Sequence, residues 1–444
     1  MSDEVLECDF LVIGAGMAGL SAAGWAAERG ARVVVVEKAG AIGGSAVLSG
    51  GMLWTAASPQ KMALYGGGDP RLGKVICERY PDALAWLRKR GIHVSPAMKV
   101  LHGYGYQIDI VEHLRGCVDL VEQGGGYVAL GTTTATLLKD DDGRVTGART
   151  VHEDGQVDIH ARHTLLATGG FQGSEEMRAR LIHENARKML LRSNPHSTGD
   201  GLRLGQAAGG DVRGTNRGFY GHLVSRPNAW GEERYFTMLS QYHSDHALLF
   251  NEAGERFCDE TFGDHTNTCH TVAQPNARAI CLWDARVQAE HATRPIVAIA
   301  PPLDKFAVAI EHGGEGVIAH THEALAAFAA AHGFDGTAMI RSLRDYNVRA
   351  TNGWETLTPP RTESCLPIDR PPWYALVVYP AITFTFGGLT IDERAQVLDG
   401  DGAAVAGLLA AGSDAGDAFG VGYAGGLALA MTFGMTAART AGWN

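Results

Sequence analysis

Short runs of branched apolar residues alternate with Ala-rich segments over the first forty positions of the chain. Residues 8–13 form an apolar run that ends at a glycine, which is typical of a parallel strand buried on both faces. Residues 18–26 are rich in Ala and lead to the turn at Arg29 and Gly30, so they predict a helix. The four valines at 33–36 predict a second buried strand, which ends on Glu37. Together these elements predict a βαβ unit.

Residues 132–170 follow a different pattern, in which short alternating segments are separated by the turn signals KDDDG and HEDG. This alternation predicts a β-meander, which closes on TLLATGG, a buried strand that runs into paired glycines. The apolar stretch 419–438 predicts a buried helix. Its glycines and polar residues are not typical of a transmembrane helix.

The composition changes between residues 219 and 363, where His, Asn, Arg and Trp become more frequent and residues 323–332 predict an Ala-rich helix. The tail then returns to Gly-rich apolar runs. We therefore predict an α/β protein whose first domain combines residues 1–218 and 364–444, with residues 219–363 inserted as a second domain.

Composition and charge restrict the possible partners. The 444 residues include 38 Lys and Arg against 49 Asp and Glu, a formal charge of −11, and 45% of them are hydrophobic. An acidic globular chain with no basic patch argues against nucleic acid as a partner and against insertion into a membrane. The seven cysteines are scattered, and four of the first ten residues are acidic, where a secretory signal needs basic and apolar ones. We therefore expect reduced thiols and a cytoplasmic location.

Two polar groups of the inserted domain are expected to be structural. His243 and His246 lie three residues apart in YHSDH, but no third ligand accompanies them, so we expect no metal site. Arg256 and Glu260 are expected to brace the domain.

A glycine motif at the first predicted turn carries the first functional signal. Gly14, Gly16 and Gly19 lie between a predicted strand and a predicted helix, and Glu37 ends the next strand about twenty residues on. Such glycines permit a tight turn and close approach of a pyrophosphate to the helix N-terminus. The acidic residue at the strand end accepts hydrogen bonds from ribose hydroxyls. The pattern therefore predicts a bound dinucleotide.

Motifs along almost the whole chain resemble the fumarate reductase and 3-ketosteroid dehydrogenase group of flavoproteins. They are, in order, KAGAIGGSAVLSGG, LLATGGF, STGDGLRLGQAAGG, NEAGERFCDE, PPWYA, TFGGLTID, LAAGSDAG and YAGGLALAMTFG. The resemblance implies a Rossmann-like FAD-binding domain of the glutathione-reductase type, made from both ends of the chain, and an inserted α+β cap domain. It also implies that the substrate is a small molecule held at the interface of the two.

The resemblance places a set of residues near FAD: Gly14, Gly16, Gly19, Glu37, Lys38, Gly43, Gly44, Ser45, Ser49, Gly50, Gly51, Gly169, Gly170, Asp200, Gly412 and Asp414. Relatives with covalent FAD attach it through a His in the region of Gly44 and Ser45. Because this chain has no His there, we expect FAD to be bound non-covalently.

Three departures from the family pattern bear on the substrate. Dicarboxylate members carry a carboxylate-binding His at the position of Phe384, an Arg at the position of Tyr423 and a proton-donating Arg where Asp264 aligns. Burying two carboxylates against these replacements would cost desolvation free energy that no positive charge offsets. Fumarate and succinate are therefore disfavoured as substrates.

The ketosteroid dehydrogenases carry a Tyr at the position of Tyr423, and its hydroxyl holds the substrate ketone together with a backbone N–H, which aligns here with Gly426. Their proton-abstracting Tyr aligns with Asp264, and His265 follows, so either of these two residues is a candidate base. Tyr104 or Tyr106 offers a further hydroxyl. Tyr423 and Asp264 also have plainer interpretations, as a packed helix-start residue and as a loop or capping residue.

These residues lead us to expect an FAD-dependent dehydrogenase that introduces a C=C bond α,β to the ketone of a cyclic substrate. The alternative is reduction of an activated alkene, such as an unsaturated acid, by flavin that a partner has reduced. A flavin-binding protein with an altered, non-redox or nucleic-acid-linked role is a third possibility, which the acidic charge and the absence of a basic patch disfavour. The sequence does not identify the electron acceptor.

Overall fold

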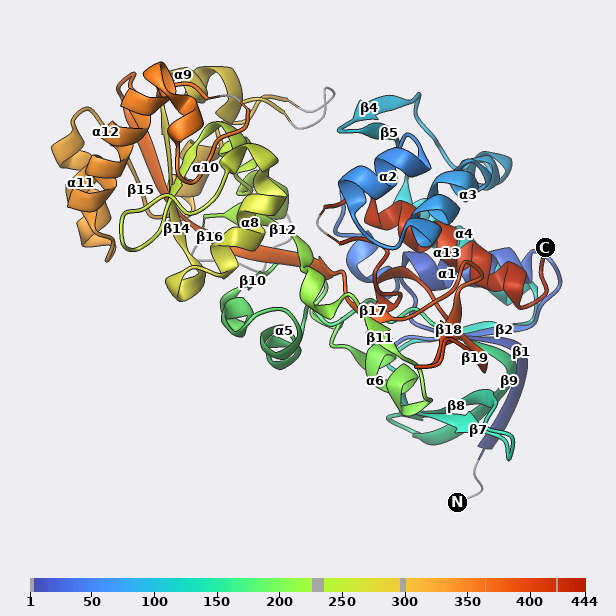
Figure 1. The fold of residues 1–444 in the computed structure, drawn as a ribbon. Coiled ribbons are helices and arrows are strands. Elements are labelled where there is room, and N and C mark those ends of the chain that lie inside the picture. Colours follow the sequence, from blue (N-terminus) through green and yellow to red (C-terminus); the bar gives the residue numbers. More distant parts are fainter. Residues whose placement is uncertain (1–3, 226–234, 296–300, 364, 421) are drawn as a thin grey trace. The chain divides into compact units, whose positions relative to one another are not determined.

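The computed structural model describes residues 4–225, 235–295, 301–363, 365–420 and 422–444 (Figure 1). The chain divides into two compact units. Unit 1 consists of Met1–Ile182, Ser193–Phe219 and Phe384–Asn444, and unit 2 consists of His183–Arg192 and Tyr220–Thr383.

The boundaries of the units follow strand pairing. The chain leaves unit 1 after Phe219, one residue from the expected position, but it returns at Phe384 instead of 364. The return is later because the long strand β16 (Trp373–Thr385) pairs with β14 (Ala279–Asp284) and β15 (Gly316–Ala319) of unit 2. Residues 183–192 belong to unit 2 because β10 (Leu190–Leu191) also pairs with β16.

Unit 1 is built on an eight-stranded sheet whose main path has the order β18-β19-β9-β1-β2-β6. The pairs from β19 to β6 are parallel, whereas β7, β8 and β9 form an antiparallel meander. The strands are β1 (Glu4–Ile13), β2 (Val33–Val36), β6 (Tyr127–Ala129), β7 (Thr133–Lys139), β8 (Val145–His152), β9 (Gly155–Leu166), β18 (Gln396–Leu398) and β19 (Ala404–Ala410). The predicted α/β class, βαβ unit and meander are confirmed.

Helices cover the parallel part of this sheet, with α1 packed against α4 and α13 (Figure 1). Small residues make the close packing possible: a Cβ at Gly434 of α13 would lie 2.3 Å from the carbonyl oxygen of Ala18 in α1. The helices of unit 1 are α1 (Met17–Ala27), α2 (Pro59–Gly66), α3 (Pro70–Lys89), α4 (Ile110–Gln123), α5 (Glu175–Leu181), α6 (Asp200–Ala207) and α13 (Gly426–Thr440). Smaller sheets are formed by β3 (Met52–Ala56), β4 (Met98–Val100) and β5 (Gly103–Gln107), and by β11 (Val212–Arg213) and β17 (Gly388–Leu389).

Unit 2 is an α+β unit with its own six-stranded, largely antiparallel sheet, in the order β10-β16-β14-β13, with β12 and β15 also paired to β16. Its core consists of the buried strands together with apolar side chains of the helices. The further strands are β12 (Phe219–Val224) and β13 (Leu248–Phe250), and the helices are α7 (Tyr235–Met238), α8 (Asp264–Val272), α9 (Ala285–Val287), α10 (Lys305–Glu311), α11 (His322–Ala331) and α12 (Gly336–Asn352). The Ala-rich helix expected at 323–332 corresponds to α11.

The apolar C-terminal stretch differs from the prediction at its start, since α13 begins at Gly426 and not at residue 419. Gly425 adopts a φ of 99°, and a Cβ there would lie 1.8 Å from the carbonyl oxygen of Trp54, so the chain turns sharply against β3 before the helix begins. Among the described residues, no helix combines the length and the apolar character needed to cross a bilayer.

Candidate functional site

The turn after β1 has the geometry that a dinucleotide requires. Gly14 has a φ of 109°, and a Cβ at this position would lie 2.2 Å from the carbonyl oxygen of Ala167. A Cβ at Gly19 would lie 1.9 Å from the carbonyl oxygen of Gly14, so only glycine fits either position. Gly16 caps α1 without a side-chain hydrogen bond, and no acidic residue lies in the first turn. The N-terminus of α1 therefore suits an anionic pyrophosphate.

Glu37 at the end of β2 faces this same turn. Its two carboxylate oxygens accept hydrogen bonds from the backbone N–H groups of Ala15 and Ala39, each at 2.8 Å. Since each oxygen has a second lone pair, the fixed carboxylate retains acceptor capacity for ribose hydroxyls.

Lys38 and Asp200 bind each other. The Lys38 ammonium lies 2.5 Å from Asp200 Oδ2 and donates to Thr198 Oγ1 at 2.7 Å, while Arg203 also contacts Asp200. The structure therefore gives both residues protein partners, and a direct contact with the cofactor stays a prediction.

The second glycine-rich segment forms a loop that only glycines permit. Gly43, Gly44 and Gly51 have φ values of 110°, 52° and 76°. Ser45 Oγ lies 2.7 Å from Ser193 Oγ, and Ser49 Oγ donates to Ala46 O at 2.8 Å. The carbonyl oxygen of Gly50 accepts a hydrogen bond from Gln107 Nε2 at 2.6 Å.

Asp414 fastens the end of β9 to the segment that follows β19. Its carboxylate accepts hydrogen bonds from the Thr168 backbone N–H, from Thr168 Oγ1 at 3.0 Å and from the Gly170 N–H at 3.2 Å. Burial raises the pKa of this carboxyl group. Asp414 thus shapes the turn of Gly169 and Gly170. Both of these glycines have positive φ values, and so does Gly412.

Two polar side chains beside Gly170 were missed by the sequence analysis. Gln172 Oε1 and Thr385 Oγ1 are buried, and within the described residues neither has a hydrogen-bond partner. A Cβ at Gly170 would lie 3.0 Å from the first atom and 2.6 Å from the second. Unsatisfied buried acceptors are costly unless a ligand pairs with them, and the polar edge of FAD fits this need. The available signal was a Gln directly after the motif LLATGGF and a second Thr within the motif TFTFGG.

Tyr423 lies in an aromatic cluster of unit 1. Its ring centroid is 5.4 Å from that of Trp54 and 5.8 Å from those of Phe384 and Phe419, and Phe386 contacts both phenylalanines. The four neighbouring rings are buried, whereas Tyr423 is partly exposed. The Gly426 N–H donates to Tyr423 Oη at 3.0 Å. The structure therefore places the two groups expected to hold a ketone next to each other, with the Gly426 N–H directed at Tyr423 Oη. A contact of either group with a ketone stays a prediction.

Tyr104 and Tyr106 lie on β5, paired with Thr55 and Leu53 of β3. Tyr104 is exposed, and the ring of Tyr106 lies 6.3 Å from that of Tyr80. A role for either hydroxyl stays a prediction.

In unit 2, Asp264 begins α8 and is buried beside His222 of β12. Asp264 Oδ2 lies 2.5 Å from His222 Nδ1, and Oδ1 accepts the Leu223 N–H at 3.0 Å. Burial raises the pKa of Asp264 to about 8, and burial together with the Arg192 guanidinium lowers the pKa of His222. His222 has no recognisable signal in the sequence, because it lies 42 residues before Asp264 in a segment without a recognised motif.

Tyr220 lies next to both histidines of this region. Its ring centroid is 4.9 Å from that of His222 and 5.7 Å from that of His265, which is partly buried. On another side, the Tyr242 ring lies 4.9 Å from His222, and Arg192 donates to Tyr242 Oη at 3.2 Å.

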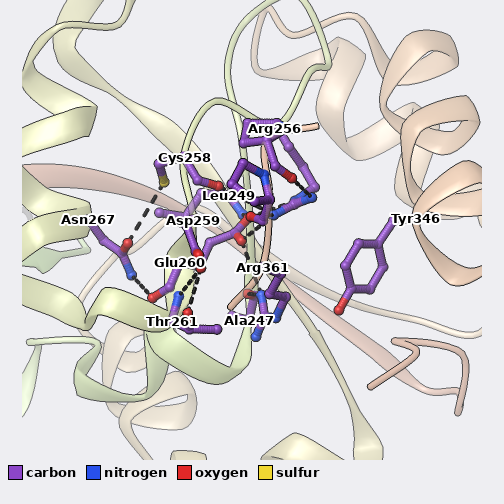
Figure 2. A network of polar contacts seen from close by, with 12 residues as sticks. Ala247, Leu249, Arg256, Cys258, Asp259, Glu260, Thr261, Asn267, Tyr346 and Arg361 are labelled. Atoms are coloured by element: carbon purple, nitrogen blue, oxygen red, sulfur yellow. Dashed lines mark hydrogen bonds and ion pairs between the residues drawn. The ribbon is translucent and has the colours of Figure 1, made fainter. Parts of the chain in front are cut away.

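A buried ionic network holds the segment that precedes Asp264 (Figure 2). The carboxylate of Glu260 is fully buried and pairs with Arg256 at 2.6 Å and with Arg361 at 3.1 Å. The carbonyl oxygen of Glu260 accepts a hydrogen bond from Asn267 Nδ2 of α8 at 2.9 Å. Since a buried carboxylate is tolerated only when paired, this network fixes the start of α8 and with it Asp264.

Comparison with known proteins identifies the family. The family model described as FAD binding domain matches residues 9–125 and 127–427. The chain is 27% identical over 466 residues to a fumarate reductase (cytochrome) of Shewanella frigidimarina. The alignment covers 98% of this chain and 76% of the relative. It is 25% identical over 544 residues to the 4-oxocyclohexanecarboxylate 2-dehydrogenase of Sinomonas cyclohexanicum, covering 97% and 92% of the two chains.

Among solved structures, the 3-ketosteroid Δ1-dehydrogenase of Sterolibacterium denitrificans is similar with a TM-score of 0.77 and 18% identity, over 98% of this chain and 99% of that chain. This likeness shows the fold. The family match over most of the chain, together with the glycine-lined cradle of unit 1, shows that the chain belongs to the FAD binding domain family and is an FAD-dependent oxidoreductase.

Proposed function

We propose that the enzyme introduces a C=C bond α,β to the ketone of a cyclic substrate. The observation that carries this proposal is the Tyr423 hydroxyl, which lies within an aromatic cluster and accepts the Gly426 N–H at 3.0 Å. Removing an α-proton from a ketone places negative charge on its oxygen. A preorganised donor in apolar surroundings stabilises that charge more strongly than water does.

The glycine turns and Glu37 would hold FAD without a covalent bond. FAD would supply the oxidising power for desaturation, as an acceptor of the hydride from the β-carbon. Tyr423 donates its O–H to the ketone oxygen, and a base at Asp264 or its immediate partners takes the α-proton. The α-proton and the β-hydride both leave the substrate, so the product is an α,β-unsaturated ketone.

The aromatic cluster also supports the choice of substrate class. Phe384, Phe386 and Phe419 are buried together around Tyr423 and make its surroundings apolar. A neutral ring suits such surroundings, whereas a second carboxylate placed there would lose its hydration without gaining a partner. The 4-oxocyclohexanecarboxylate 2-dehydrogenase among the relatives is named for a cyclic ketone.

A second candidate is reduction of an activated alkene by flavin that a partner has reduced. The raised pKa of Asp264 favours this second candidate. A carboxyl group with a pKa of about 8 holds its proton at neutral pH and is able to deliver that proton to a substrate. A fumarate reductase is also among the relatives.

Product analysis separates the two. Holoenzyme is mixed with a saturated cyclic ketone and an artificial electron acceptor, and separately, after reduction of its flavin, with an unsaturated acid. The proposal expects an enone from the first mixture at a higher rate than any saturated acid from the second. Formation of saturated acid alone would establish the second candidate instead.

A further inference from the structure

We propose that Nε2 of His222 is the atom that exchanges the proton with the substrate α-carbon, and that Asp264 is a positioning residue which acts through this histidine. The inference rests on the proposed function, since it assigns the proton acceptor of that reaction. It replaces Asp264 and His265 in this role with a residue that no motif indicated.

The carboxylate of Asp264 is turned toward its own unit. Oδ1 accepts the backbone N–H of Leu223 at 3.0 Å, and Oδ2 lies 2.5 Å from His222 Nδ1. Asp264 is 7% exposed and begins α8, whose start is fixed by the Glu260 network. Both oxygens therefore have fixed partners, and the group that the carboxylate addresses is the imidazole ring.

The imidazole ring is oriented by its contact with Asp264. With Nδ1 bonded to the carboxylate, the second ring nitrogen, Nε2, lies on the side of the ring that faces away from Asp264. The rings of Tyr220 and Tyr242 contact the imidazole nearly edge to face, at interplanar angles of 79° and 70°. A carboxylate that holds one imidazole nitrogen fixes the tautomer in which the other nitrogen carries a lone pair.

The proton transfer from the substrate can be written in full with His222 and Asp264 alone. In the competent form Asp264 is ionised and His222 is neutral, with its proton on Nδ1. The substrate α-C–H bond breaks, a new N–H bond forms at Nε2, and the electron pair stays on the substrate as an enolate whose oxygen receives the hydrogen bond from Tyr423. The pair then consists of an imidazolium and a carboxylate, which attract each other in their buried surroundings.

The charged and titratable groups around the pair come from several elements. Arg192 follows β10 and bonds Tyr242, and its positive charge disfavours the imidazolium. Asp245 in the segment after Tyr242 interacts electrostatically with Asp264, as does Cys281 of β14. The positive charge of Arg192 therefore favours loss of the proton from His222 after the transfer. This effect is useful, because His222 must release the proton in each turnover.

The test compares two substitutions in the holoenzyme, with the anaerobic rate of flavin reduction by a cyclic ketone as the measurement. His222→Gln is expected to lower this rate by about 10²- to 10⁴-fold, the usual contribution of general acid–base catalysis. Asp264→Asn is also expected to lower the rate, because one amide oxygen cannot accept from both the Leu223 N–H and Nδ1, so the tautomer of His222 is no longer fixed. His270→Gln, on the exposed side of the same helix α8, is the matched control and is expected to keep the wild-type rate.

A rate of flavin reduction in His222→Gln within threefold of wild type, combined with loss of activity in Asp264→Asn, would overturn the inference and leave the proposed function intact.

A second measurement does not depend on turnover or on folding of the variants. Nitrogen-15 NMR of histidine-labelled wild-type holoenzyme distinguishes the two ring nitrogens of His222. The His222 signals are assigned as those that disappear in His222→Gln. If that variant fails to fold, His222→Asn serves for the assignment. The inference predicts a proton on Nδ1 above pH 8 and titration at Nε2. A proton on Nε2 with an unprotonated Nδ1 above pH 8 would contradict it. If no ketone reduces the wild-type flavin, the proposed function fails, and the NMR result still decides which nitrogen is the acceptor.

Discussion

The two units position their functional groups by different means. In unit 1 the cofactor cradle depends on the backbone, since Gly14 and Gly19 leave no room for a side chain, and the glycine turns use positive φ values. In unit 2 the proton site that we propose depends on buried polar side chains, namely the pair of His222 and Asp264 and the network around Glu260. The first site is set by the shape of the backbone, and the second by the identity of buried ionisable side chains.

The largest effect is expected from a side chain placed in the cradle. Gly14→Ala would bring a Cβ to 2.2 Å from Ala167 O at a φ of 109°, so the turn cannot keep its shape. We expect loss of bound FAD, measured as the ratio of flavin to protein absorbance after purification. Gly40→Ala is the control, because the space around that Cβ is open. Full FAD content in Gly14→Ala would contradict a cradle made by the backbone.

The corresponding change in unit 2 removes the charge of Glu260. Glu260→Gln leaves Arg256 and Arg361 buried without their carboxylate, which is expected to cost about 3–5 kcal/mol of unfolding free energy. Glu290→Gln, which breaks the exposed pair with Arg286, is expected to cost about 1 kcal/mol or less. Urea unfolding of both holoenzymes measures the difference. Equal losses would mean that the buried network does not stabilise unit 2.

A smaller effect, confined to chemistry, is expected at Tyr423. Tyr423→Phe keeps the aromatic packing and removes the donor to the ketone, so flavin reduction should slow by about 10²- to 10³-fold with FAD content unchanged. Stopped-flow absorbance gives the rate. Phe386→Tyr adds a hydroxyl elsewhere in the cluster and serves as a control for the effect of polarity. An unchanged rate in Tyr423→Phe would remove this hydroxyl from the mechanism.

The smallest expected effect is the pH dependence set by unit 2. Because the pKa of Asp264 is raised to about 8, the proton-accepting form of the pair is populated above that pH and depleted below it. Flavin reduction by a ketone should therefore rise about tenfold per pH unit toward pH 8 and then level off. Reoxidation of reduced enzyme by an alkene should show the opposite trend. A flat profile from pH 6 to 9 would mean that this pair does not exchange the proton.

The sequence predicted unit 1 better than unit 2 for a physical reason. The turn of Gly14, Gly16 and Gly19 is local, so its spacing alone indicates a nucleotide, and Glu37 follows within one βαβ unit. His222 and Asp264 are 42 residues apart and meet only because β12 and α8 pack together. Asp264 was found through its place in a motif, but its partner has no sequence signature.

The domain return at Phe384 illustrates the same limit, because it depends on long-range pairing of β16 with strands of unit 2. Composition indicated where the inserted segment begins. It did not show that a strand after residue 364 completes the second sheet.

The central claim is that a cyclic ketone is oxidised at the α,β-position, and anaerobic titration of the oxidised holoenzyme with such a ketone tests it most directly. The account predicts loss of the oxidised flavin absorbance near 450 nm, roughly one enone per FAD, since each desaturation transfers two electrons to one cofactor. Unchanged flavin absorbance with every ketone, together with rapid reoxidation of the reduced enzyme by an unsaturated acid, would contradict it.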